Sequence, residues 1–204
     1  MRTLSKMLAV YDPCTGKSTL IGPDAGTRGA KTWPADLDRD WYVRNADEIV
    51  PVNFSIEDGR VVPYAPCGKF DSAGRCLAAL REYLEAEVGT GTDLCGWCVE
   101  ASELLVALLG LAGIENARTV EGWCRFDNDW YGSDRPYDPH TWVSVPAASL
   151  GLQETGNCYL DTTADQFNPG MYPENEYPPY VIRLGLPHGM CLDEPTEDEG
   201  DDEN

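Results

Sequence analysis

Apolar residues recur at helical spacing through the middle of the chain. One set, spaced by three and four residues, begins near Asp71 and Ser72, either of which could cap the first turn, and stops at Gly89. Its members are Cys76, Leu77, Leu80, Tyr83, Leu84 and Val88. The pattern then predicts a second helix, from Thr92 or Asp93 to Ala112, that is apolar on nearly all sides. A helix of that kind belongs in the centre of a domain.

Strand-like patterns flank these two helices. Upstream, two hairpins are predicted, with strands at Leu4–Tyr11, Ser18–Ile21, Ile49–Ile56 and Arg60–Tyr64. Between the hairpins, the composition of Gly22–Asp40 predicts a loop. Downstream, strands are predicted at Arg118–Phe126, His140–Val145 and Cys158–Thr162, followed by a proline-rich irregular segment at Asn168–Pro187.

This order of elements predicts an α+β fold, in which a central helix packs against an antiparallel sheet and β-hairpins come first. We expect residues 1–66 to form a β-rich N-terminal part that is integral to the same domain. Residues 67–191 form the predicted core. The acidic segment 192–204 is expected to be disordered, because it has too few apolar residues to fold.

The charge and hydropathy of the chain narrow its possible partners. With 15 basic and 35 acidic residues, the net charge is −20, which repels nucleic-acid phosphates. No apolar run is long enough to span a membrane, and Met7–Val10 is too short for the core of a signal peptide. We therefore expect a cytoplasmic protein with neither nucleic-acid nor membrane partners. Its eight cysteines are expected to be reduced thiols.

Three residues, in the order Cys98, His140 and Asp161, suit a thiol-based catalytic site. Cys98 lies near the start of the predicted central helix, where free N–H groups and the helix dipole stabilise a thiolate. His140 begins a strand and is one of only two histidines in the chain. Asp161 ends the next strand and can accept the second ring N–H of that histidine. We expect a nucleophile, a base and an orienting carboxylate, with no metal or cofactor.

The segments around these residues resemble the core motif of the transglutaminase-like superfamily over residues 92–165. The resemblance is carried by Gly-x-Cys at Gly96–Cys98, an Ala- and Leu-rich helix, Gly113-Ile114 fifteen residues after the cysteine, Ala117–Gly122, the His-x-Trp strand His140–Val145 and the Asp-containing strand Leu160–Thr163. Two departures are an extra residue before Gly122 and Asp-Thr-Thr where Asp-Pro-Thr is common. The resemblance implies a papain-like α+β fold with a catalytic triad of Cys98, His140 and Asp161.

The implied activity is acyl transfer at an amide of a protein or peptide substrate. Water as the acceptor gives a peptidase or another amide hydrolase, which we favour because it needs no second substrate site. An amine acceptor gives a transglutaminase, and deamidation is a further possibility. Trp97 and Trp142 are candidates for substrate contact. A non-catalytic peptide-binding module on the same fold is the alternative of a different class.

Other cysteine chemistries also fit parts of the sequence. Cys95 and Cys98 form a Cys-x-x-Cys pair, as in dithiol oxidoreductases, and oxidation of this pair would switch a nucleophilic Cys98 off. The same pair could bind zinc together with two further cysteines from the set Cys67, Cys76, Cys124 and Cys158. A Gly-Lys-Ser-Thr run at residues 16–19 lacks the first glycine of a phosphate loop and lies in a predicted hairpin.

Overall fold

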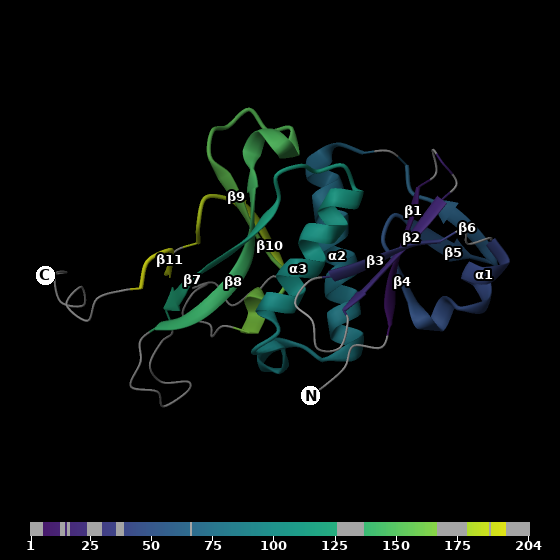
Figure 1. Cartoon of the computed structure of the whole chain (residues 1–204), viewed down its shortest axis with the longest axis horizontal. Helices are drawn as coiled ribbons and strands as arrows, with labels where there is room; N and C mark the ends of the chain where they lie inside the picture. Colours follow the sequence, from purple (N-terminus) through teal and green to yellow (C-terminus); the bar gives the residue numbers. More distant parts are fainter. Residues whose placement is uncertain are drawn as a thin grey trace, which may run out of the picture.

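The computed structural model describes residues 6–12, 15, 17–23, 30–35, 39–65, 67–125, 137–166, 179–187 and 189–194. Its largest sheet is antiparallel and curled, with the strand order β10-β9-β8-β7-β11. The strands are β7 (Arg118–Arg125), β8 (Tyr137–Pro146), β9 (Asn157–Asp161), β10 (Val181–Leu184) and β11 (Met190–Cys191). Two helices, α2 (Lys69–Glu87) and α3 (Cys98–Leu111), pack against it (Figure 1). The expected α+β class is confirmed.

The N-terminal part contributes a second, smaller sheet on the far side of the helices (Figure 1). Its strand order is β3-β2-β1-β4, with β4 parallel to β1 and the other neighbours antiparallel. The strands are β1 (Met7–Asp12), β2 (Lys17–Pro23), β3 (Ala30–Ala35) and β4 (Ile49–Pro51). A separate hairpin joins β5 (Phe54–Glu57) to β6 (Arg60–Pro63), and a short helix, α1 (Arg39–Arg44), precedes β4.

The first predicted hairpin is confirmed, and the second is confirmed in part. In the second, Asp58 (φ 46°) and Gly59 (φ 69°) both have left-handed backbone, as a two-residue turn of this twist requires. The predicted strand Ile49–Ile56 is split instead, because β4 pairs with β1 while β5 pairs with β6. The predicted loop Gly22–Asp40 was wrong in part, since it contains β3, which completes the edge of the smaller sheet beside β2.

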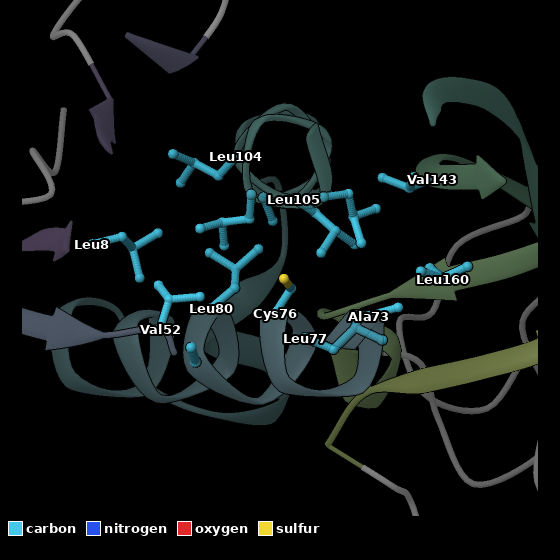
Figure 2. Packing of buried hydrophobic residues seen from close by; sticks show 14 of the residues in the cluster. Leu8, Val52, Ala73, Cys76, Leu77, Leu80, Leu104, Leu105, Val143 and Leu160 are labelled. Atoms are coloured by element: carbon cyan, nitrogen blue, oxygen red, sulfur yellow. The ribbon is translucent and has the colours of Figure 1, made fainter. Parts of the chain in front are cut away.

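One apolar core joins the N-terminal strands, both helices and the large sheet. Figure 2 shows Leu8 of β1 and Val52 facing Leu80 of α2 and Leu104 of α3, while Val143 of β8 closes the other side. All five side chains are buried. The central position predicted for the second helix is therefore confirmed, and α3 is held from several directions by packing.

Several predicted elements have other ends than expected. The first helix, α2, begins at Lys69 with Gly68 as its cap residue, and β8 begins at Tyr137, so His140 lies within its strand and does not begin it. The second helix begins at Cys98 rather than at Thr92 or Asp93, because the chain first forms a 3-10 turn, η2 (Gly91–Leu94), and then a bend. The predicted irregular segment Asn168–Pro187 contains β10, which pairs with β9. Residues 168–178 and most of the predicted acidic tail lie outside the described residues.

Within the described part of the chain, no helix combines the length and the apolar character needed to cross a membrane. Three further 3-10 turns complete the elements of the described residues. They are η1 (Ala46–Glu48), η3 (Ala147–Leu150) and η4 (Ala164–Gln166). The last of them directly follows β9 and therefore lies next to Asp161.

Candidate active site

Cys98 is the first residue of α3. The first hydrogen bond of this helix runs from the Ala101 N–H to the Trp97 carbonyl (2.9 Å), so the N–H groups of residues 98–100 have no carbonyl partner within the helix. These groups and the helix dipole favour negative charge at the half-buried Cys98 thiol. The later start of the helix therefore places the cysteine closer to this favourable field than the predicted boundary did.

His140 lies on β8, opposite Gly122 of β7. The indole of Trp142, two residues further along β8, packs beside the His140 ring at 6.0 Å between centroids and against Tyr159 at 5.7 Å. A Cβ atom on Gly122 would overlap the Trp142 ring and the backbone oxygen of Cys191. The absence of a side chain at Gly122 thus makes room for the indole that supports the histidine.

The His140 ring is bound directly to Asp161, which ends β9. His140 Nε2 lies 2.8 Å from Asp161 Oδ2, and both side chains are about 2 % exposed. Tyr159 donates its hydroxyl proton to the same oxygen at 2.6 Å. The other carboxylate oxygen, Oδ1, accepts hydrogen bonds from the backbone N–H (2.8 Å) and the hydroxyl (2.9 Å) of Thr163. Four donors therefore satisfy a carboxylate that is buried.

The charges of the three predicted residues are coupled. Burial alone would lower the pKa of His140, but the charge and hydrogen bond of Asp161 raise it to about 9. Burial alone would raise the pKa of Asp161, whereas His140, Tyr159 and Thr163 lower it. Burial also opposes ionisation of Cys98, yet the nearby imidazole of His140 brings the pKa of the thiol below its usual value. The arrangement favours a thiolate, an imidazolium and a carboxylate in a row.

The backbone N–H and carbonyl of Thr141 connect α3 to β8 beside these three side chains. Its N–H bonds to Cys98 and helps to lower the pKa of the thiol. Its carbonyl accepts a hydrogen bond of 3.1 Å from the hydroxyl of Ser102, which lies one helical turn after Cys98. Because His140 is the neighbour of Thr141, these two contacts set the position of the helix relative to the histidine.

A buried arginine on α2 supports the segments on either side of the site. The Arg81 guanidinium binds both carboxylate oxygens of Asp165 at 2.6 Å and donates to the carbonyls of Thr162 (3.2 Å) and Pro179 (2.9 Å). Asp165 also accepts the Gly91 N–H at 3.1 Å. One ion pair thus connects the segment that follows Asp161 to the segment that leads towards Cys98.

The two tryptophans predicted to contact substrate have different positions. Trp142 is only 1 % exposed and is enclosed by His140 and Tyr159, so its role is packing beneath the histidine, and it lies too deep for direct contact with a substrate. Trp97 is half-buried at the edge of the core, directly before Cys98. Of the two residues, only Trp97 has surface available to a ligand.

The remaining thiols differ from Cys98. Burial raises the pKa of Cys76 to about 12 and raises the pKa of Cys124 and Cys158 as well. No disulfide joins the cysteines of the described residues, in which Cys95 is exposed and Cys98 half-buried. Over the same residues, no three His, Cys, Asp or Glu side chains gather as a metal site. The zinc alternative therefore has no ligand set there.

Three residues that hold the site together were not predicted from the sequence: Tyr159, Thr163 and Arg81. For Tyr159 a signal was present, because side chains two apart on a strand share a face, which places it beside Asp161. For Arg81 the signal was a charged residue within the apolar face of the helix Lys69–Glu87, between Leu77 and Leu84. No comparable pattern marks Thr163 before the turn after β9 is known.

Comparisons with known proteins do not add to this picture, since no protein-family model, no curated protein and no solved structure matches the chain. The site itself therefore supplies the information on function. The site consists of a half-buried thiol at a helix N-terminus, an imidazole that lowers the pKa of this thiol, and a buried carboxylate 2.8 Å from that imidazole.

Proposed function

We propose that this chain is a cysteine-dependent amide acyl-transfer enzyme, and most simply a peptidase or another amide hydrolase. The observation that carries the proposal is the 2.8 Å contact between His140 Nε2 and Asp161 Oδ2, with the Cys98 thiol near enough for the same imidazole to lower its pKa. The resemblance of residues 92–165 to the transglutaminase-like superfamily supports the same three roles and a papain-like arrangement. A helix packed against an antiparallel sheet is compatible with that fold.

The first step is attack by the thiolate. Because Nε2 faces the carboxylate, Nδ1 is the ring nitrogen available to the thiol, and its proton forms the ion pair with Cys98. The sulfur adds to the amide carbonyl carbon, and the carbonyl π electrons move to the oxygen. The Cys98 backbone N–H, at the open end of α3, lies next to the attacking sulfur and can donate to this oxyanion.

The second step breaks the C–N bond. The imidazolium of His140 transfers its Nδ1 proton to the leaving nitrogen, the oxyanion electrons re-form the carbonyl, and a neutral amine departs. The product is a thioester on Cys98 and a neutral imidazole. Asp161 remains ionised throughout, because its four donors stabilise the carboxylate, and it keeps the ring oriented.

The acceptor of the acyl group decides the reaction type. His140 can remove a proton from water, which then attacks the thioester and releases the acid and the Cys98 thiolate. With glutamine as the amide, the same step is deamidation, and with a primary amine in place of water it is transamidation. Hydrolysis is our leading proposal because it needs only one bound substrate.

Selective alkylation tests the proposal without knowledge of the substrate. At pH 6, a thiol with an ordinary pKa is ionised only to about 0.3 %. An ion-paired Cys98 should therefore react with iodoacetamide at least about tenfold faster than the exposed Cys67 and Cys95, after allowance for the lower nucleophilicity of a stabilised thiolate. Labelling of each cysteine is followed by mass spectrometry over time.

Two histidine variants provide the comparison. His140→Ala should reduce the Cys98 rate to that of the exposed reference thiols, while His188→Ala, which changes the other histidine of the chain, should leave it unchanged. Equal, slow labelling of all accessible cysteines in the wild type would reject the proposal and favour a non-catalytic peptide-binding module. For an active thiol, peptides from a cell extract treated with wild type or Cys98→Ala distinguish new chain ends, deamidated glutamines and incorporated amines.

A further inference from the structure

The hydroxyl of Tyr159 shares one carboxylate oxygen with the catalytic histidine. Tyr159 and Asp161 are two residues apart on β9, so both side chains lie on the same face of the sheet. The Tyr159 hydroxyl donates to Oδ2 at 2.6 Å, and His140 Nε2 lies 2.8 Å from that same oxygen. All three side chains are about 2 % exposed.

This sharing has two physical consequences. The hydroxyl, together with Thr163 on Oδ1, prevents rotation of the carboxylate, so that Oδ2 stays aligned with the imidazole. It also draws electron density from the oxygen that stabilises the imidazolium. A carboxylate that held the imidazolium more strongly would make His140 a weaker acid, and proton transfer to the leaving amine would be slower.

We propose that Tyr159 is a positioning residue of the triad, whose hydroxyl both fixes the Asp161 carboxylate and limits how strongly that carboxylate holds the protonated His140. This inference rests on the proposed function. It differs from a merely structural role, in which the Tyr159 hydroxyl needs a partner only because it is buried. A structural role affects stability, whereas the proposed role also changes the acidity of His140.

Other titratable groups also lie near His140, and the test must distinguish their effects on its pKa from that of the Tyr159 hydroxyl. Cys98 faces the ring from the end of α3, and Cys124 of β7 experiences the charge of Asp161. Asp138 lies on β8 itself, two residues before His140. Beyond Thr162, the charge of Asp165 is compensated by Arg81. Tyr159→Phe leaves all of these side chains in place, so a shift of the histidine titration reports the loss of the Tyr159 hydroxyl.

The experiment is an NMR titration of the histidine rings in the full-length protein. The chain has two histidines, so a His188→Gln variant assigns the His140 signal. Tyr159→Phe should move the His140 titration to higher pH by about 0.5 to 1 pH unit, because Oδ2 of Asp161 then accepts a hydrogen bond from His140 but none from residue 159. Tyr83→Phe is the matched control: Tyr83 is also fully buried, and its hydroxyl has no hydrogen-bond partner among the described residues. It should leave the titration unchanged.

A second substitution keeps the test decisive if Tyr159→Phe does not fold. 3-Fluorotyrosine at position 159 retains the ring and donates a stronger hydrogen bond, so the His140 titration should move to lower pH. An unchanged His140 titration in every folded Tyr159 form would overturn the inference. Fast alkylation of Cys98 at pH 6 in the wild type would still support the proposed function in that case, so the two failures are distinguishable.

Discussion

The central role of Asp161 leads to a prediction for its isosteric amide. Asp161→Asn keeps the shape of the side chain and a carbonyl oxygen for its donors, but it removes the negative charge that stabilises the His140 imidazolium. Burial then acts on the histidine without compensation and lowers its pKa. Without the imidazolium, the main contribution that lowers the pKa of Cys98 is lost.

The size of the effect follows from the pKa of His140. That pKa should fall from about 9 to its ordinary 6.5 or below. A fall of about 2.5 pH units corresponds to a free energy on the order of 3 kcal/mol, or a factor of roughly 300 in the ion-pair equilibrium. The alkylation rate of Cys98 at pH 6 should drop by at least about tenfold. The stability should change as well, because a raised histidine pKa stabilises the fold below pH 6.5 and this contribution disappears as the pH rises through 9.

Alkylation and unfolding measurements check this prediction together. Iodoacetamide rates for Cys98 are compared at pH 6 between wild type, Asp161→Asn and the control Asp138→Asn, which removes a charge from the same strand as His140. Urea unfolding between pH 6.5 and 9 should show a loss of stability in wild type that is absent from Asp161→Asn. If Asp161→Asn reacts as fast as wild type at pH 6, or if Asp138→Asn slows equally, the coupled thiolate, imidazolium and carboxylate are not the source of reactivity.

Three further substitutions test the supports of the site. Gly122→Ala should destabilise the protein by about 1–3 kcal/mol in urea unfolding, because the new methyl group overlaps the Trp142 ring and β11; a neutral result would show that the indole can move. Ser102→Ala should lower the free energy of unfolding by about 1 kcal/mol and slow Cys98 alkylation a few-fold, since the hydrogen bond to Thr141 positions α3. Slower alkylation without the loss of stability would show that this hydrogen bond is not the cause of both effects. Arg81→Met should cost about 3 kcal/mol or more, because it leaves a largely buried carboxylate unpaired, and combining it with Asp165→Asn should recover part of the loss.

The helices and most of the large sheet could be predicted from the sequence, because their apolar periodicity agrees with their burial. The face of α2 that packs in the core consists of the predicted apolar residues, and β7, β8 and β9 lie where alternation placed them. The strand β3 could not be predicted in this way. It is an edge strand in a segment rich in turn-forming residues, and its pairing with β2 is a non-local interaction that local composition does not encode.

The candidate catalytic residues could be proposed from their order in the chain, whereas the residues that support them could not. Cys98 begins α3 and Asp161 ends β9, whereas His140 lies within β8 and was singled out mainly because the chain has only one other histidine. Tyr159 and Arg81 act through contacts whose partners become known only in three dimensions. Arg81 in particular binds carbonyls 81 and 98 residues further along the chain, at Thr162 and Pro179.

The start of α3 shows how a local conformation sets the chemistry of the thiol. Asp93 is a good helix cap by composition, and the apolar pattern allowed a helix from Thr92 onward. Gly96 has a φ of 80°, which no right-handed helix can include, and the Trp97 N–H bonds to the Leu94 carbonyl at 3.0 Å to close a turn. The helix therefore starts only after this glycine. Had it begun at residue 92, the N–H of Cys98 would be bonded within the helix. Because it begins at Cys98, that N–H is available to the oxyanion of the proposed reaction, and a thiolate at this position is stabilised by the positive end of the helix dipole.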